Sequence, residues 1–230
     1  MSKIQSLGST RKIDNTKIAL FDIDYTLFNT KRFRFRLYNG VGAVLQKKQG
    51  KKLSQKVYAD IREELDYFDS RMFVQKLSQH VPKKEDAKHI EEALWSKKNF
   101  YEGLYAETKN TLKKLLERGI PIGIFSKGET RFQRAKLISI EDLLTEEHIH
   151  ITLNKHTSLP KLIDKYKGKR IFLIDDALDV LYKAHELDPS IFTIWVKRGK
   201  FAKKQEPIFG FTPNATVLNL RTVTRLITEN

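Results

Sequence analysis

Apolar residues recur along this chain in short runs, and longer segments with helical periodicity separate them. The short runs are rich in Ile, Leu, Val and Phe and predict buried strands. They lie at residues 17–21, 120–125, 149–153, 170–174 and 191–196. The first run is followed by Asp22 and Asp24, so two acidic side chains lie just after the end of a predicted strand.

The segments between these runs predict helices. In 108–118 three leucines share one face and Gly119 follows as a stop signal. Residues 31–104 look helical throughout, with clear periodicity in 54–68 and a Pro-led start to 82–94. Further helices are predicted at 130–138, 159–166, 177–186 and from 222 onward.

Alternation of strands and helices implies βαβ units, a parallel sheet and a doubly wound α/β core. The long helical block interrupts this alternation after the first strand. We therefore predict a Rossmann-like core formed by residues 1–30 and 105–230, with a small all-helical domain inserted at 31–104.

The composition excludes several classes of protein. The chain has 230 residues, enough for a sizeable core, and no cysteine, which rules out disulfide scaffolds, thiol nucleophiles and Cys-based zinc sites. The N-terminal residues lack the apolar segment of a signal peptide, and the longest apolar runs are far too short to span a bilayer. We expect a soluble, cytoplasmic protein with no membrane partner.

The formal net charge of +15 is unevenly distributed. Residues 31–59 hold nine basic residues and no acid, and a smaller basic cluster spans 197–204. Each could be a solvated face, and the alternation of charge with aromatics in 31–36 also occurs in nucleic-acid binders. Our hypothesis is that the two clusters ring the entrance of a site and attract an anionic substrate. Four residues of the helical insertion should contribute most to this attraction: Lys31, Arg32, Arg34 and Arg36.

Polar groups follow the predicted strands in order. Asp22 and Asp24 follow the first strand, Ser126 and Lys127 the second, Lys155 the third, and Asp175 with Asp176 the fourth. In a doubly wound sheet, ligands bind beyond the carboxyl ends of the strands. We therefore expect these side chains to meet at one edge.

Phosphoryl transfer is the chemistry that such a set could carry out. Asp22 is placed to attack phosphorus, and Asp24 suits general acid–base catalysis. Crowded carboxylates without His or Cys point to Mg²⁺, held by Asp22, Asp175 and Asp176. Ser126 and Lys155 would donate to the phosphoryl oxygens.

The chain resembles the haloacid dehalogenase (HAD) superfamily of phosphohydrolases over nearly its whole length. The resemblance rests on four motifs: Phe21–Phe28, Ile122–Ser126, Lys155, and Ile174–Asp179. It implies that Asp22 is the nucleophile and that Asp24 is the acid–base residue and lends its backbone carbonyl to Mg²⁺. The dehalogenase branch lacks the second acid, so a phosphatase or phosphomutase is implied. The helical insertion resembles the cap that closes over small substrates.

Two assignments stay open. Lys155 leads into a helix that Thr157 or Ser158 would cap, and Lys161 within that helix is the second choice for the phosphate-binding lysine. Asp175 keeps the usual spacing to Asp179 and ranks before Asp176 as the metal ligand. Three further residues are assigned supporting roles: Thr26, Lys127 and Asp179.

The predicted function is an Mg²⁺-dependent phosphatase that acts on a small phosphorylated substrate. The alternatives are a phosphatase for nucleotides or nucleic-acid ends guided by the basic cap, a phosphomutase, and a non-catalytic binding module with the same fold. The intact set of catalytic groups argues against the last. Both a monomer and a homodimer are compatible with the sequence.

Overall fold

The computed structural model describes residues 14, 16–45, 48–81 and 84–230. The elements are β1 (Lys17–Phe21), α1 (Thr30–Val44), α2 (Lys48–Leu65), α3 (Ser70–Ser78), α4 (Lys84–Leu94), α5 (Lys97–Tyr101), α6 (Thr108–Glu117), β2 (Ile122–Lys127), α7 (Thr130–Ala135), β3 (Ile149–Thr152), α8 (Lys155–Lys165), β4 (Arg170–Asp175), α9 (Leu178–Leu187), β5 (Phe192–Val196), α10 (Gly199–Lys204), β6 (Ala215–Val217) and α11 (Val223–Glu229), with short 3₁₀ turns at Glu141–Leu143, Glu146–His148 and Leu220–Thr222.

The strands form one parallel sheet in the order β3-β2-β1-β4-β5-β6, which confirms the predicted α/β class. β1 lies between β2 and β4, so the direction of winding reverses at β1. Its carboxyl end is therefore the switch point at which doubly wound sheets bind ligands. Residues Ile18 to Phe21 are all buried, as expected for a strand covered on both faces.

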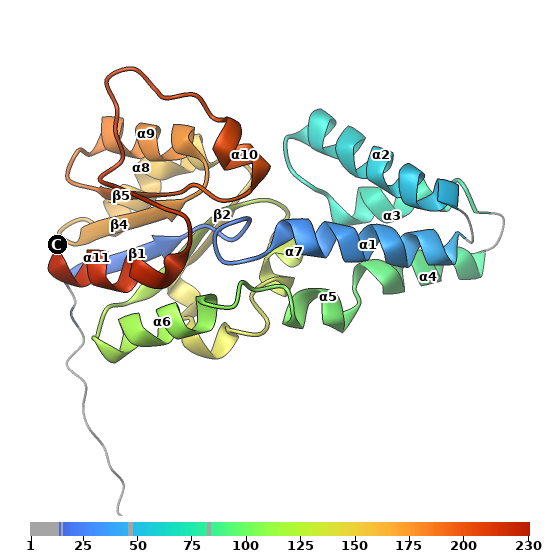
Figure 1. Cartoon of the computed structure of the whole chain (residues 1–230), viewed down its shortest axis with the longest axis horizontal. Helices are drawn as coiled ribbons and strands as arrows, with labels where there is room; N and C mark the ends of the chain where they lie inside the picture. The colour runs from blue at the N-terminus through green and yellow to red at the C-terminus, as the bar shows by residue number, and fades with distance from the viewer. Residues whose placement is uncertain (1–13, 15, 46–47, 82–83) are drawn as a thin grey trace, which may run out of the picture.

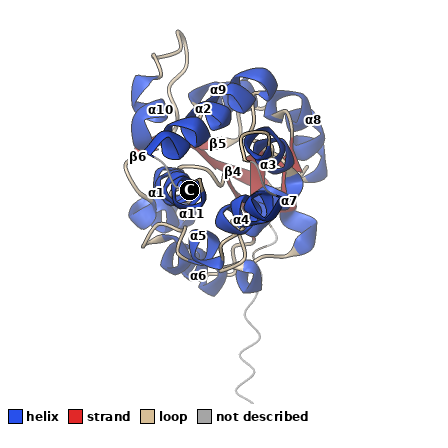
Figure 2. Ribbon diagram, turned by 90° about the vertical axis from the view of Figure 1, so that its right-hand side faces the viewer, coloured by secondary structure: helices blue, strands red, loops and turns tan. Residues whose placement is uncertain are grey.

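Alternate residues of β1 face two different apolar layers. Ala19 and Phe21 belong to a cluster with residues of α6 and α11, whereas Ile18 and Leu20 belong to a cluster with residues of α8 and α9. The helices accordingly cover the sheet on both sides (Figure 1, Figure 2). This layering fixes the register of β1 and with it the direction of the residues that follow.

Helices α1 to α5 stand together beyond the carboxyl edge of the sheet, in the position predicted for a cap (Figure 1). The apolar cluster around Phe21 continues without a break into the cap. Phe132, from α7 of the core, packs against cap rings, with ring centres 5.4 Å from Phe33 and 4.8 Å from Phe68. The cap is thus packed onto the core by aromatic contacts, and we retain 31–104 as our proposed domain limits.

Three details differ from the sequence-based expectation. β2 extends to Lys127 because Ser126 and Lys127 pair in register with β3. α8 begins at Lys155, since the Asn154 side chain, rather than Thr157 or Ser158, accepts the capping hydrogen bond. α10 and β6 were not predicted, because a strand of three residues carries no readable alternation. Pro82, the expected start of the helix now seen as α4, and the N-terminal residues 1–13 lie outside the described residues.

Among the helices of the described segments, none is both long and apolar enough to cross a membrane.

Two connections join core and cap, and they are bonded to each other. The N–H of Asn29 donates to the Gly103 carbonyl at 2.7 Å, and the N–H of Tyr105 donates to the Leu27 carbonyl at 3.0 Å. Gly103 lies against the Phe28 ring, so closely that a Cβ at this position would be 1.9 Å from a ring carbon. Only glycine fits there without displacing Phe28, which is part of the first motif.

We predict that Gly103→Ala lowers the free energy of unfolding by about 1–3 kcal/mol, because overpacking must move the Phe28 ring or the connection. Thermal unfolding would measure this. Gly40→Ala in α1 is the control, since its Cβ would meet only ordinary contact with Ala93 at 3.4 Å and alanine favours the helix. Equal stability of Gly103→Ala and the native chain would contradict this reading of the junction.

Candidate active site

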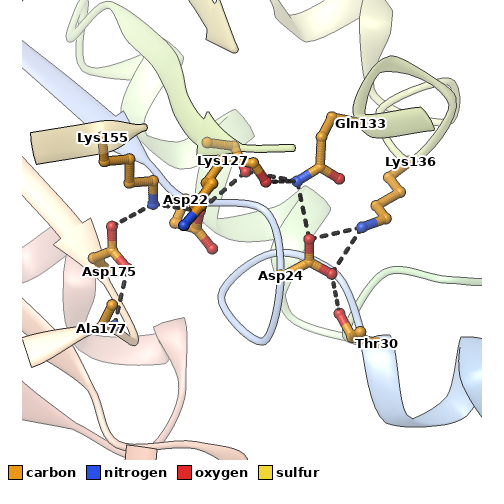
Figure 3. A network of polar contacts seen from close by, with 10 residues as sticks. Asp22, Asp24, Thr30, Lys127, Gln133, Lys136, Lys155, Asp175 and Ala177 are labelled. Carbon is orange, nitrogen blue, oxygen red and sulfur yellow. Dashed lines mark hydrogen bonds and ion pairs between the residues drawn. The ribbon is translucent and has the colours of Figure 1, made fainter. Parts of the chain in front are cut away.

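The predicted residues meet at the carboxyl edge of the sheet. Asp22 directly follows β1, and its N–H donates to the Ile174 carbonyl of β4 at 2.9 Å. Ser126 lies near the end of β2, Lys155 opens α8 after β3, and Asp175 ends β4. Figure 3 shows side chains from these separate elements converging around Asp22. The structure therefore places together the groups that the strand-end argument selected.

Asp22 is held by two donors. Its Oδ1 accepts from the Ser126 hydroxyl at 3.0 Å and from the Lys155 ammonium at 2.6 Å, so both donors engage the same carboxylate oxygen. Lys155 also donates to Asp175 Oδ2 at 2.6 Å and so lies between the two carboxylates. Burial raises the pKa of Asp22 to about 7, against the opposing effect of Lys155. Keeping Asp22 ionised at neutral pH thus requires more positive charge than Lys155 supplies.

Three buried carboxylates could hold a cation, because Asp22, Asp175 and Asp176 each offer an oxygen within 4.8 Å of the others. Burial, together with the charges of Asp22 and Asp175, raises the pKa of Asp176 well above its ordinary value. Its buried Oδ2 has no hydrogen-bond partner in the described chain. Hard oxygen donors with an unused buried carboxylate oxygen fit a divalent ion such as Mg²⁺.

The unused oxygen bears on the choice between Asp175 and Asp176. Asp175 accepts from the Ala177 N–H at 2.9 Å through Oδ1 and from Lys155 through Oδ2 (Figure 3). Asp176 keeps one oxygen without a protein partner. We therefore propose Asp176 as the more available ligand, with Asp175 as its neighbour in the same cluster.

A tight loop carries Asp24 away from Asp22. Tyr25 adopts a left-handed backbone conformation, with φ of 58°, and its N–H donates to the Phe28 carbonyl at 3.0 Å. Such strain in a residue that is not glycine is characteristic of functional loops. The turn ends at Asn29, whose side chain caps α1 by accepting from the Arg32 N–H at 3.0 Å.

The Asp24 carboxylate is surrounded by donors. Lys136 donates to its two oxygens at 2.8 and 2.7 Å, Gln133 donates at 3.0 Å, and Thr30 adds a further hydrogen bond (Figure 3). Burial acts to raise the pKa of Asp24, but Lys136 and these hydrogen bonds outweigh it and hold the pKa below its ordinary value. Asp24 is therefore ionised in this arrangement.

No role was predicted from the sequence for Gln133 or Lys136. Their spacing places them on one face of the segment after β2, which is the signal that could have assigned them. Gln133 also donates to Ser126 Oγ at 3.0 Å. It thereby links the donor on Asp22 to the environment of Asp24.

The remaining candidates form no hydrogen bond or ion pair with Asp22 in the described chain. Lys161 is exposed and does not line the cavity, whereas Lys155 does. We therefore keep Lys155 as the first choice for a phosphate-binding lysine. Lys127 forms an ion pair with Asp66 of the cap. Asp179 is exposed at the cavity rim, 3.2 Å from His156. Thr26 is fully buried, and its hydroxyl has no partner among the described residues.

A cavity of about 590 Å³ separates the core residues from the cap. The cap contributes side chains that sequence reasoning did not single out for the site, chiefly Tyr58, Arg62 and Tyr67. They belong to different helical turns and to a loop, so no short motif could reveal them. The volume is typical of sites for small molecules.

The hypothesis that both basic clusters ring the entrance is largely wrong. Of the four cap residues named foremost, only Arg34 lines the cavity. Arg32 and Arg36 both form ion pairs with Glu102. In the second cluster Arg198 forms an ion pair with Glu107 and packs 3.7 Å from the centre of the Tyr105 ring. Lys47 and the side chains of Lys48 and Lys200 lie outside the described residues.

No protein-family model matches this sequence, and the search of curated proteins gave no match. Solved structures do match. A haloacid dehalogenase-like hydrolase of Burkholderia xenovorans superposes with a TM-score of 0.74 at 22% identity, over 91% of this chain and 97% of that chain. The L-2-haloacid dehalogenase of Xanthobacter autotrophicus gives 0.62 at 13% identity, over 92% of this chain and 98% of that chain. The HAD-hydrolase YfnB of Bacillus subtilis, bound to magnesium, superposes with a TM-score of 0.62 at 12% identity, over 92% of this chain and 98% of that chain.

At these identities the likeness concerns the fold, and it extends through both the sheet and the helical insertion. Together with the parallel sheet and the buried acidic cluster at its switch point, it shows that the chain has the fold of the haloacid dehalogenase-like hydrolases.

Proposed function

We propose that this protein is an Mg²⁺-dependent phosphatase that hydrolyses phosphate monoesters through an aspartyl phosphate on Asp22. The observation that carries the proposal is Asp24, a second carboxylate that lines the same cavity as Asp22. Displacement of a halide needs no proton donor for the leaving group, whereas displacement of an alkoxide does. The comparisons include dehalogenases, so the choice between these reactions depends on Asp24 itself.

In the first step, Asp22 Oδ2 attacks phosphorus, the bond from phosphorus to the ester oxygen breaks, and the leaving oxygen takes a proton from Asp24. In the second step, water attacks phosphorus and gives a proton to Asp24, and the bond to Asp22 breaks with release of phosphate. Because Lys136 keeps Asp24 ionised, the structure corresponds to the base form used in the second step. The first step requires the same carboxyl group to be protonated when substrate is bound.

The charges around Asp22 support this reaction. Ser126 and Lys155 are donors already aimed at Asp22 Oδ1, within reach of a phosphoryl group bound there. Asp22, Asp176 and the backbone carbonyl of Asp24 would hold Mg²⁺, with Asp175 beside them. When bound, the ion would neutralise the carboxylates and the phosphoryl oxygens, so that an anionic nucleophile can approach an anionic ester.

A small substrate fits better than a nucleic-acid end. The cavity has a volume of about 590 Å³, and most of the basic residues in 31–59 do not line it. A phosphomutase would use the same two aspartates, with a sugar hydroxyl in place of water. The products of a phosphate-release assay separate these outcomes.

We predict that the protein releases phosphate from small monoesters only with Mg²⁺, and that EDTA abolishes this activity. Asp22→Asn should lower kcat about a thousandfold or more, since the amide cannot attack phosphorus. Asp164→Asn, on the exposed face of α8, is the matched control and should retain full activity. Retained hydrolysis by Asp22→Asn, with folding verified by circular dichroism, would overturn the proposal.

A second prediction concerns the halide reaction. Native protein incubated with L-2-chloropropionate should release no chloride above the level of Asp22→Asn, because we assign the site to phosphate esters. Ion chromatography measures the product directly. Chloride release without phosphatase activity would assign the site to dehalogenation.

A third prediction concerns pH and metal binding. Without metal, the pKa of Asp22 in the folded protein is about 7, above the value of about 3.9 for an unfolded aspartate. The folded state therefore binds more protons between about pH 4 and pH 7, and ionisation of Asp22 removes stability as the pH rises through that window. Because Mg²⁺ favours the ionised form, it should raise Tm more at pH 8 than at pH 5.

Thermal unfolding with Mg²⁺ or EDTA at the two pH values measures this difference. Asp176→Asn should reduce the Mg²⁺-dependent rise in Tm at pH 8, since it removes the carboxylate with the unused oxygen. An equal Mg²⁺ effect at both pH values would show that the ion binds elsewhere.

A further inference from the structure

Arg34 is the one residue of the basic segment 31–36 that lines the cavity. It lies on α1, one helical turn after Thr30, which is hydrogen-bonded to Asp24. The Nε of Arg34 donates to the Tyr38 hydroxyl at 2.9 Å. This places a half-buried guanidinium group on the cap side of the cavity that also contains Asp22.

Aromatic side chains hold this guanidinium group in place. Its Cζ lies 4.7 Å from the centre of the Tyr58 ring and 5.7 Å from that of Tyr38. The Tyr58 ring is buried and stacks on Phe68, with centres 4.5 Å apart and planes 20° apart. The position of Arg34 is thus fixed before any ligand binds, which lowers the entropic cost of binding one.

The charge of Arg34 is not used within the described chain. No carboxylate of the described residues lies within ion-pair distance of it, whereas Arg32 and Arg36 on the same helix both pair with Glu102. Its Nε donates to the Tyr38 hydroxyl, so the two terminal nitrogens of the guanidinium group remain available to donate to a ligand. A fixed guanidinium with both terminal nitrogens available is suited to bidentate binding of a carboxylate or phosphate.

A second cation lies on the same side of the cavity. Arg62, one turn after Tyr58 on α2, is exposed at the lining and has no ion-pair partner among the described residues. The lysines of the cavity differ, since Lys127 pairs with Asp66 and Lys155 with Asp22 and Asp175. The cap side of the cavity therefore presents two arginines that pair with no carboxylate of the described residues, whereas its one carboxylate, Asp66, is paired with Lys127 of the core.

We infer that the substrate carries a second anionic group on its leaving portion, a carboxylate or a second phosphate, which binds to Arg34 with Arg62 beside it. This inference rests on the proposed phosphatase function, because it places the ester phosphate at Asp22. It assigns Arg34 as a specificity residue that binds the part of the substrate that does not react. The two sources of the anion, carboxylate and phosphate, are distinguished by the choice of substrate.

The test uses substrate pairs that differ in the second anion. Glycerol 3-phosphate and 3-phosphoglycerate differ in a carboxylate, and fructose 6-phosphate and fructose 1,6-bisphosphate differ in a phosphate. In at least one pair the native protein should favour the substrate with the second anion about tenfold or more in kcat/KM. That ratio corresponds to the discrimination expected from one charged hydrogen-bonded contact.

Arg34→Ala should raise KM for the preferred substrate about tenfold or more, and its effect on the partner substrate should be at least ten times smaller. Arg34→Lys keeps the charge but loses the planar fork, so its KM for the preferred substrate should lie between those of the native protein and Arg34→Ala. Arg36→Ala is the matched control, because Arg36 lies on the same helix and pairs with Glu102 away from the cavity. An equal loss for both members of each pair would make Arg34 a structural residue and overturn the inference.

A binding measurement separates this inference from the proposed function. Calorimetry with Asp22→Asn and Mg²⁺ needs no turnover, and the member with the second anion should bind about tenfold more tightly, a preference that Arg34→Ala should remove. Preferential binding without hydrolysis by the native protein would leave the anion site standing and overturn the phosphatase. Hydrolysis with no preference in either pair would overturn the anion site and leave the phosphatase proposal standing.

Discussion

The site depends on how four carboxylates, three of them buried and that of Asp24 partly exposed, can lie close together. A parallel sheet brings Asp22, Asp175 and Asp176 to one edge, and the loop after β1 adds Asp24. Two lysines separate these charges, since Lys155 lies between Asp22 and Asp175 and Lys136 binds Asp24. Four carboxylates against two ammonium groups leave two negative charges in surroundings where unpaired charge is costly. Burial of this uncompensated charge raises the pKa of Asp22 and Asp176, and a bound divalent cation would supply the missing balance.

The cavity is lined by side chains of both the core and the cap. The core supplies Asp22, its two donors and the acidic cluster, and the cap supplies two arginines that line the same cavity. Phe132 of the core packs among the rings of Phe33, Phe68 and Phe100, so the two parts share one apolar cluster. The same aromatic packing that joins cap to core also orients Arg34, through Tyr58 and Phe68. The proposed recognition of substrate by Arg34 thus depends on the packing that joins the cap to the core.

The sequence predicted those features that depend on order along the chain. The parallel sheet followed from strand and helix alternation, and the meeting of Asp22, Ser126, Lys155 and Asp175 followed from their places at strand ends. It could not predict contacts made by residues far apart in the chain without a shared motif. The Asp24–Lys136 pair joins residues separated by 112 positions, and Arg34 is distinguished from Arg32 and Arg36 by its place in the cavity lining and because Glu102 pairs with those two. Charge counting could therefore locate the basic segment but could not identify which of its residues lines the cavity.

The claim that Asp22 carries the phosphoryl group is tested most directly by rapid acid quench of the native protein during turnover, followed by mass spectrometry of the peptide that contains Asp22. Reaction with an active phosphate ester and Mg²⁺ should add one phosphoryl group to that peptide, and the group should be absent from Asp22→Asn. Hydroxylamine, which cleaves acyl phosphates, should remove it. Phosphate release at full rate with no phosphoryl group on the Asp22 peptide at any quench time would contradict the account.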